Sequence, residues 1–355
     1  MNFESVLPVL IVGYGTMGRL YVRDLANLGL PPEQMTVVDL SEEALAACKH
    51  AYPAIQVTRD INIALRRKPG MCLNLVNSPA HYSVFHAAIA GGVRHLFAEK
   101  PIVDVQHLSD AERLLNQAHT CTTGYLINFS QAVEKLVSLM QKHDLRITQG
   151  RSIWGKDRTK DTRPTAGSVE DEMTHPIQLL LTLVRLNQKI ESMSVRSMLD
   201  YVTFVNAERQ REAHLQDTSF PLEPVSTASA SMNLRTNTGN TRLFLQSSFV
   251  SFEQERRVEL LLSHRLGAPA YKAKLVFDVD GEDRLYYAQM GEKQCETFSY
   301  PSNHKLIDQL QAVGLYVSGN KPDPRLVHLP HALEAVRVSS AVLEANQLEG
   351  ITINP

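Results

Sequence analysis

Short apolar runs alternate with amphipathic stretches through the first part of the chain. The apolar runs are rich in β-branched residues and predict buried strands at residues 9–12, 35–38, 71–76 and 95–98. The stretches between them have apolar positions at helical spacing and predict helices at residues 17–28, 42–50 and 82–90. Strands that alternate with helices of this length pair in parallel through right-handed crossovers. The pattern therefore predicts an α/β fold with a doubly wound parallel sheet.

The pattern changes after about residue 145, where strands follow one another with few helices between them. One amphipathic helix is predicted at residues 171–186. Strands are predicted at residues 147–154, 194–199, 228–235, 242–250, 257–263 and 274–279. Hairpin-type turns lie between such runs, at Thr238-Gly239-Asn240 and Asp280-Gly281. Consecutive strands favour antiparallel pairing, so this part predicts an α+β domain with a large, mostly antiparallel sheet.

The length of 355 residues fits two domains of ordinary size. We predict that the first domain covers residues 1–145 and the second covers residues 146–355. Two closing helices, at residues 304–318 and 329–346, are expected to pack back on the first domain. Residues 201–225 are polar and lack periodicity, which predicts a long insertion or flexible loop.

The composition excludes several classes of protein and names no function. Hydrophobic residues make up 43% of the chain and charged residues 21%, as in ordinary globular proteins. The net charge of −2 gives no reason to expect nucleic acid or an anionic membrane as a partner. The longest apolar run near the start, residues 6–12, contains Pro8 and is far shorter than the ~20 residues of a membrane span.

The cysteines indicate a reducing compartment. The four of them lie far apart, at Cys48, Cys72, Cys121 and Cys295. No pair has the spacing of a metal site or a redox motif. We therefore expect free thiols, a cytoplasmic protein and no metal ion.

A glycine-rich turn follows the first predicted strand and begins the first predicted helix. Its sequence is a complete G-x-G-x-x-G, formed by Gly13, Tyr14, Gly15, Thr16, Met17 and Gly18. The first glycine permits a tight turn, the second lets the backbone approach a pyrophosphate, and the third lets the helix pack close to the strand. Amides at the start of the helix then bind the phosphate charge. These six residues are our candidates for binding a dinucleotide.

Asp39 ends the second predicted strand at the spacing that a dinucleotide site requires. An acidic side chain at this place accepts hydrogen bonds from the adenosine ribose and repels a 2′-phosphate. The next residues, Leu40 and Ser41, supply no arginine that would accommodate NADP. We therefore expect NAD as the cofactor, with NADP less favoured.

Glu99, Lys100 and Pro101 follow the strand at residues 95–98, at the edge where parallel sheets bind ligands. A charged triplet at a strand end is also common in ordinary loops. A lysine there can stabilise a developing alkoxide by its charge, or relay the proton of the alkoxide. Asn77 and Ser78 follow another strand of the same sheet in the same way.

Together these motifs resemble the glucose-fructose oxidoreductase/inositol dehydrogenase (Gfo/Idh/MocA) family over nearly the whole chain. The resemblance rests on the glycine turn, on Asn77-Ser78-Pro79, on Glu99-Lys100-Pro101, on residues 171–175 and on the final helices. It implies that Lys100 lies at the nicotinamide and contacts the reacting oxygen. It also implies that Glu99, Asn77 and Ser78 lie at the nicotinamide ribose and that the peptide bond before Pro101 is cis.

Asp171 and His175 lie four residues apart, on one face of the predicted second-domain helix. Such a pair can be a general acid/base with its orienting carboxylate, two metal ligands, or a helix-start acid with an incidental histidine. No third ligand at a suitable spacing supports a metal. The resemblance implies that His175 transfers a proton and that Asp171 is its partner or a ligand of the substrate.

Two further residues are candidate substrate ligands, with departures from the family pattern around them. Asn128 stands where many relatives carry arginine, and Thr174 precedes the histidine. Met173 and Gln178 replace the glycine and the aspartate that the family often has.

A charged stretch precedes this helix and has two readings. It is either a solvated loop or an anion-binding segment in which Lys156, Arg158 or Arg163 holds a carboxylate or phosphate of the substrate.

The sequence thus predicts an NAD(P)-dependent oxidoreductase that transfers a hydride between nicotinamide and the C–OH or C=O carbon of a sugar, polyol or sugar-derived acid. One alternative is a tightly bound NAD that serves glycoside cleavage or C=N reduction. The other is a sensor without catalysis that reads a dinucleotide or sugar. The resemblance also implies a homodimer or homotetramer that pairs through the exposed face of the second sheet.

Overall fold

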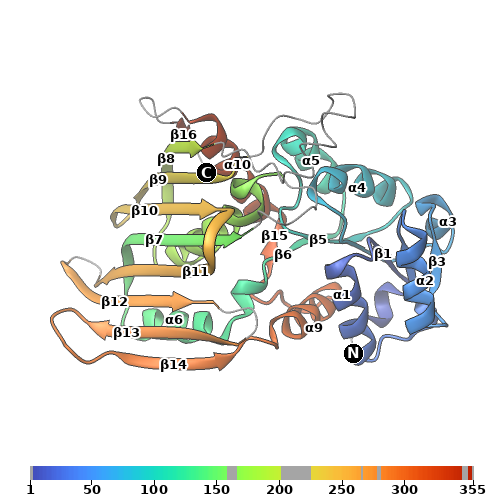
Figure 1. Ribbon diagram of the computed structural model, residues 1–355, viewed down its shortest axis with the longest axis horizontal. Coiled ribbons are helices and arrows are strands. Elements are labelled where there is room, and N and C mark those ends of the chain that lie inside the picture. Colours follow the sequence, from blue (N-terminus) through green and yellow to red (C-terminus); the bar gives the residue numbers. More distant parts are fainter. Residues whose placement is uncertain are drawn as a thin grey trace. The chain divides into compact units, whose positions relative to one another are not determined.

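The computed structural model describes residues 3–157, 166–200, 225–264, 267–277, 281–345 and 351–353. The chain forms two compact units (Figure 1). The first comprises Met1–Phe129 and His304–Val336, and the second comprises Ser130–Asn303 and Arg337–Pro355. The division into folding domains at residue 145 stays a prediction.

The first unit has a seven-stranded sheet with the order β15-β6-β5-β4-β1-β2-β3. Neighbouring strands are parallel, except that the short β15 runs antiparallel to β6. The strands are β1 (Val9–Val12), β2 (Met35–Val38), β3 (Gln56–Thr58), β4 (Met71–Asn74), β5 (His95–Glu99), β6 (Thr120–Gly124) and β15 (Val327–His328). Residues of β1, β2 and β4 are all buried, as central strands of a sheet covered on both faces should be.

Helices cover both faces of this sheet (Figure 1). The α-helices of the unit are α1 (Thr16–Asn27), α2 (Glu42–Ala51), α3 (Ile61–Leu65), α4 (His81–Ala90), α5 (Leu108–Leu115) and α9 (Lys305–Val317). Side chains of α1, α2 and α9 share one hydrophobic core with alternate residues of the strands, such as Ile11 and Val37. The late helix α9 thus completes the layer that α1 begins.

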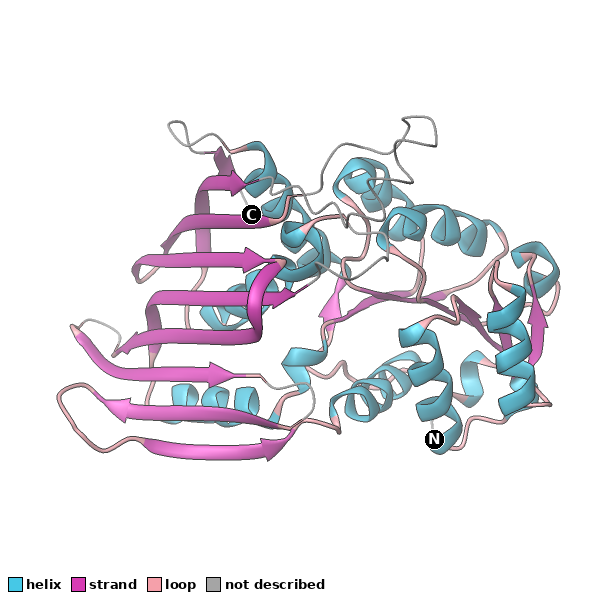
Figure 2. Ribbon diagram, in the orientation of Figure 1, coloured by secondary structure: helices cyan, strands magenta, loops and turns pink. Residues whose placement is uncertain are grey.

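The second unit is built on a nine-stranded sheet with the order β14-β13-β12-β11-β7-β10-β9-β8-β16 (Figure 2). All neighbours pair antiparallel except β7 and β10, which are parallel. The strands are β7 (Arg146–Asp157), β8 (Ile190–Asp200), β9 (Thr227–Thr236), β10 (Gly239–Ser248), β11 (Val250–Ser263), β12 (Pro269–Val276), β13 (Glu282–Gln289), β14 (Glu296–Pro301) and β16 (Ile351–Ile353).

Helices cover one face of the second sheet, and its other face carries exposed side chains. Helix α6 (Gln131–Lys142) packs on β12, β13 and β14, and α7 (Thr174–Arg185) packs on β7. The C-terminal part of α10 (Leu329–Glu344) meets β8, where the Ser197 hydroxyl donates to the carbonyl of Val342 at 2.6 Å. At Gly150 of β7, a β-carbon would lie 3.2 Å from a methyl group of Leu180 on α7, so helix and sheet pack closely there.

The fold predicted from the sequence is confirmed: a mostly parallel Rossmann sheet and a large, mostly antiparallel second sheet. The strands predicted at residues 9–12 and 35–38 match β1 and β2 residue for residue. The strand predicted at 242–250 was too long, because β10 ends at Ser248 and Val250 begins β11. The predicted insertion at residues 201–225 lies outside the described residues except for Val225, and so does Asp280 of the second predicted turn.

The helix predicted at residues 171–186 begins differently from the expectation. Val169–Met173 forms a π-helical turn, in which the Thr174 N–H is directed to the carbonyl of Val169, five residues back. Pro176 has no N–H to donate to the carbonyl of Glu172, so α-helical geometry gains no hydrogen bond at this point. The α-helix therefore begins only at Thr174.

Candidate functional site

The glycine turn has the geometry that a pyrophosphate site needs. Gly13 has φ +98°, and a β-carbon on it would lie 2.7 Å from the carbonyl oxygen of Leu75. A β-carbon on Gly18 would collide with the carbonyl of Gly13. A β-carbon on Gly15 would meet nothing within 4 Å, so the open space lies where the backbone should approach a phosphate.

Asp39 is tied to the glycine turn by its own carboxylate. Its Oδ2 accepts a hydrogen bond from the Tyr14 N–H at 2.6 Å, and its Oδ1 accepts one from the Ser41 N–H at 2.8 Å. The Tyr14 side chain itself is buried, and burial raises its pKa to about 12. Tyr14 therefore contributes its amide to this arrangement, while its phenol packs inward.

A cavity of about 580 Å³ opens beside this turn. It is lined by Gly13, Gly15, Asp39 and Asn77, among others, so four of the predicted cofactor residues meet there. Arg59 lines the same cavity from the segment after β3 and pairs with Glu42 at 2.7 Å. The sequence argument about NADP considered only Leu40 and Ser41, and it missed this arginine, because β3 pairs with β2 only in the folded sheet.

Glu99 and Lys100 lie at the end of β5, next to β4. The Glu99 carboxylate accepts a hydrogen bond from the Tyr21 hydroxyl of α1 at 2.6 Å, and the Lys100 N–H lies 3.3 Å from its second oxygen. Burial raises the pKa of Glu99, and it raises that of the Tyr21 phenol as well. The side-chain amide of Gln309, on α9, lies 3.1 Å from the same hydroxyl. The sequence motifs gave no sign of Tyr21 or Gln309, which meet Glu99 only through the packing of α1 and α9.

His81 joins the two loops that carry the predicted nicotinamide residues. Its Nδ1 lies 2.8 Å from the carbonyl of Pro101, and its Nε2 lies 3.1 Å from the carbonyl of Val76. The imidazole is fully buried, and burial lowers its pKa although the carbonyls favour the charged form. The peptide bond before Pro101 is cis, as the resemblance implied.

In the second unit, the predicted pair straddles the junction between the π-helical turn and α7. Asp171 lies in the turn and His175 in the first turn of the α-helix. The His175 ring stacks on Trp154 of β7, with 5.6 Å between ring centroids and 23° between planes. Thr174 is fully buried.

A cluster of charges surrounds this stacked pair, and the sequence motifs did not reveal most of it. Glu172, with a side chain only 3% exposed, forms an ion pair with Lys156 of β7. Arg256 of β11 approaches the other oxygen of Glu172 at 3.8 Å, and its guanidinium lies 5.9 Å from the centre of the Trp154 ring. We call Trp154, Lys156, Glu172, His175 and Arg256 the sheet–helix cluster.

The other predicted substrate residues have different outcomes. Arg158 and Arg163 lie outside the described residues. Lys156 is described, and the carboxylate that it binds here belongs to the protein itself. Asn128 is buried in the first unit, where its amide donates to the carbonyl of Arg325 at 3.2 Å. A substrate contact of any of these residues stays a prediction.

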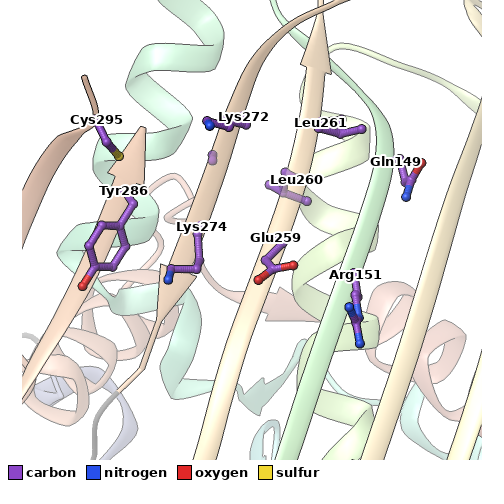
Figure 3. A pocket seen from close by; sticks show the side chains of 10 residues that line it. Gln149, Arg151, Glu259, Leu260, Leu261, Lys272, Lys274, Tyr286 and Cys295 are labelled. Carbon is purple, nitrogen blue, oxygen red and sulfur yellow. The ribbon is translucent and has the colours of Figure 1, made fainter. Parts of the chain in front are cut away.

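The exposed face of the nine-stranded sheet has a further cavity, of about 540 Å³. Arg151, Glu259 and Lys274 line it from the adjacent strands β7, β11 and β12 (Figure 3). None of the predicted site residues that the structure describes lines this hollow. Two exposed apolar side chains on this face are Met198 and Phe244.

The structure also bears on two further features of the chain, the state of its cysteines and the presence of membrane-spanning helices. Cys48, Cys72 and Cys121 are buried and Cys295 is exposed, and all four are free thiols. Within the described part of the chain, no helix has the length and apolar character needed to cross a membrane.

Comparison with known proteins supports the dinucleotide site. Residues 7–127 match the model of the GFO_IDH_MocA family, described as an oxidoreductase family with an NAD-binding Rossmann fold. A search of curated proteins finds no match.

Many solved structures share the fold of both units. UDP-N-acetylglucosamine 3-dehydrogenase GnnA from Acidithiobacillus ferrooxidans superposes with a TM-score of 0.74 at 16% identity, over 96% of this chain and 98% of that one. Apo scyllo-inositol dehydrogenase from Lactobacillus casei gives 0.69 at 14% identity, over 98% of both chains. Levoglucosan dehydrogenase in complex with NADH and L-sorbose gives 0.73 at 12% identity, over 98% of both chains. At these identities the likeness establishes the fold.

Proposed function

We propose that this chain is an NAD-dependent dehydrogenase of a sugar, a polyol or a sugar-derived acid, because its residues 7–127 match the Gfo/Idh/MocA oxidoreductase family. The observation that carries the proposal is in the first unit. The open space at Gly15, the carboxylate of Asp39 and the cavity between them fit a dinucleotide, and Lys100 follows a strand of the same sheet. The sugar and polyol dehydrogenases that share the fold support the substrate class.

The cofactor would be held by the residues that line the cavity. Amides at the start of α1 would bind its pyrophosphate, because the first N–H groups of a helix have no partner within the helix. Asp39 would accept hydrogen bonds from the adenosine ribose, and Asn77, Ser78 and Glu99 would lie at the nicotinamide ribose. When bound, NAD supplies the hydride acceptor for oxidation of a carbinol.

Lys100 would act on the oxygen of the reacting carbon. A carbinol that loses its hydroxyl proton develops negative charge on oxygen, and an ammonium group stabilises that charge directly. The Lys100 backbone is fixed by the contact with Glu99 and by the His81 bridge to Pro101.

His175 would take up the hydroxyl proton during oxidation and return it in the reverse direction. Stacking on Trp154 holds the imidazole plane, so that proton transfer needs no reorientation of the ring. Asp171 would orient His175 or bind a substrate hydroxyl.

A screen for turnover tests this function. Purified protein is mixed with NAD or NADP and a panel of inositols, aldoses, anhydrosugars and sugar acids, and NADH formation is followed by absorbance. The proposal requires substrate-dependent formation of reduced nucleotide with at least one member of the panel, faster from NAD to NADH than from NADP to NADPH. Ligands that raise the melting temperature identify candidates independently of turnover, since ligand binding stabilises the fold. Binding of NAD without any turnover over the whole panel would favour the sensor alternative.

A further inference from the structure

Arg256 presents a buried hydrogen-bond donor that no acceptor of the described residues uses. Its side chain is 23% exposed, and the Nε atom is buried without a hydrogen-bond partner among the described residues. Its contact with Glu172, at 3.8 Å, is longer than a hydrogen bond. A guanidinium offers five donors in a planar fork that matches a carboxylate or a phosphate. Burying such a group without acceptors is costly. The Glu172 oxygen that faces it, Oε2, also lacks a hydrogen-bond partner among the described residues, so the exposed part of the guanidinium stays open to an anion.

The charges around Arg256 favour an anion. Glu172 already forms an ion pair with Lys156, so one buried carboxylate lies against two cationic side chains. In a partly buried setting a guanidinium acts strongly on a nearby anion, because screening by water is reduced. An anion that binds Arg256 would compete with Glu172 for the same guanidinium.

The position of Arg256 connects it to the candidate proton-transfer residue. Arg256 on β11 is the direct neighbour of Trp154 on β7, and its guanidinium lies over the indole. His175 stacks on the same indole. One tryptophan side chain therefore fixes both the guanidinium and the imidazole, and all three belong to the second unit.

We propose that Arg256 binds an anionic group of the substrate, a carboxylate or a phosphate, while His175 acts on its hydroxyl. The inference rests on the proposed function, which gives the chain a substrate, and it narrows the substrate class to sugar acids or phosphorylated sugars. Glu172 balances Lys156 and competes with the substrate anion for Arg256.

Binding measurements on the full chain test this role. Isothermal titration at low salt, with saturating NADH, compares D-glucuronate and D-glucose 6-phosphate with neutral D-glucose. The two anions distinguish a carboxylate from a phosphate ligand. We expect the wild type to bind one of the anions more tightly than glucose, and to lose this preference as salt is added. Arg256→Gln should weaken binding of that anion by about 10- to 100-fold, which is the loss expected for a charged hydrogen bond. The affinity for glucose should change by less than about twofold.

The matched variant is Glu172→Gln, which removes the competing carboxylate and keeps the shape of the side chain. If Arg256 binds the substrate anion, this variant should bind the anion at least as tightly as the wild type. If Arg256 only neutralises Glu172, both variants should be less stable than the wild type and should bind all three ligands more weakly by the same factor. That result would overturn the proposal. Equal affinity of the wild type for glucose and for both anions, or no binding of either anion, would overturn it as well.

Two further measurements keep the outcomes separate. Arg256→Lys retains the charge without the planar fork, and it is the variant to use if Arg256→Gln does not fold; it should lose part of the preference for the anion. Turnover is followed in parallel. Anion binding that depends on Arg256, without NADH formation from any substrate, would contradict the proposed function alone. Turnover of neutral sugars with no preference for anions would contradict this inference alone.

Discussion

Asp39 and Arg59 line the same cavity and carry opposite charges. We therefore expect these two side chains to decide between NAD and NADP. Asp39→Ala should weaken NADH binding by about 10- to 100-fold, because hydrogen bonds from the ribose to a carboxylate are lost. The same change should strengthen NADPH binding, since the repulsion of the 2′-phosphate is gone and Arg59 can pair with it. Fluorescence titration with both nucleotides measures the two affinities.

The double variant Asp39→Ala/Arg59→Ala is the control for that prediction. It should lose the gain in NADPH affinity and keep the loss in NADH affinity. If NADPH binds equally well with and without Arg59, then the arginine has no part in the selection of the cofactor.

His81 links the stability of the first unit to pH. Its pKa in the folded chain lies below the usual 6.5, because the ring is buried. As the pH falls through 6.5, the unfolded chain therefore takes up a proton that the folded chain does not. The free energy of unfolding should be highest above that pH and should fall below it, by at most about 1.4 kcal/mol per pH unit from this one residue.

Chemical denaturation between pH 5 and pH 8 measures the contribution of His81. His81→Gln should be less stable than the wild type at pH 8, because it loses a buried hydrogen-bonding ring, and its stability should depend less on pH. His86→Gln, on the exposed side of the same helix, should keep the wild-type slope. Equal slopes for all three proteins would show that His81 has the same pKa in the folded and the unfolded chain, which would contradict the prediction.

At the scale of elements, α1, α9 and β5 meet at the carboxylate of Glu99. Tyr21→Phe removes the hydroxyl that donates to it, so the buried carboxylate loses a partner that lowers its pKa. We expect a loss of about 1–3 kcal/mol in the free energy of unfolding. The loss should be larger at pH 8 than at pH 5, because only the ionised carboxylate needs the donor strongly.

A denaturant titration at both pH values checks this, with Tyr316→Phe on α9 as the control for the loss of a hydroxyl. The control should change stability little and equally at both pH values. A Tyr21→Phe loss that is the same at pH 5 and pH 8 would mean that the hydrogen bond does not depend on the charge of Glu99.

Apolar patterning predicted β1, β2, β4 and β5 because the burial of these strands is decided locally. The four residues of β1 are apolar and buried, and β7 alternates as a half-covered strand should. The strands β6, β13 and β14 were missed. Strand β14 is short and mostly exposed, and β6 is buried although most of its residues are threonines or glycine. The π-helical turn before α7 was missed because it depends on hydrogen bonds around Pro176 that composition does not encode.

The composition of the sheet–helix cluster could not be predicted from the sequence. Charge patterning directed attention to Arg158 and Arg163, which are close in sequence to the predicted helix. Arg256 is far away in sequence, and it reaches Trp154 only through the pairing of β11 with β7. That pairing includes an irregularity between Val250 and Glu255, so the position of Arg256 could not be counted along the strand.

At the scale of the whole molecule, the exposed face of the nine-stranded sheet supports the expectation of a homodimer or homotetramer. Phe244 on β10 and Met198 on β8 are 42% and 53% exposed on this face, with β9 between their strands. Light scattering on a size-exclusion column should give a mass of two or four chains. Phe244→Glu should shift it toward one chain, because a charge would then be buried in the interface. A monomeric wild type would contradict the expectation.

The account depends most on Lys100 as the residue that acts on the reacting oxygen. The most direct test uses Lys100→Met, with exposed Lys321→Met as the matched control, and measures NADH affinity together with the rate of NADH formation from the substrate found in the screen. We predict that Lys100→Met binds NADH about as tightly as the wild type and loses about 100- to 10,000-fold in turnover, while Lys321→Met keeps both. Full turnover by Lys100→Met would contradict the proposed chemistry.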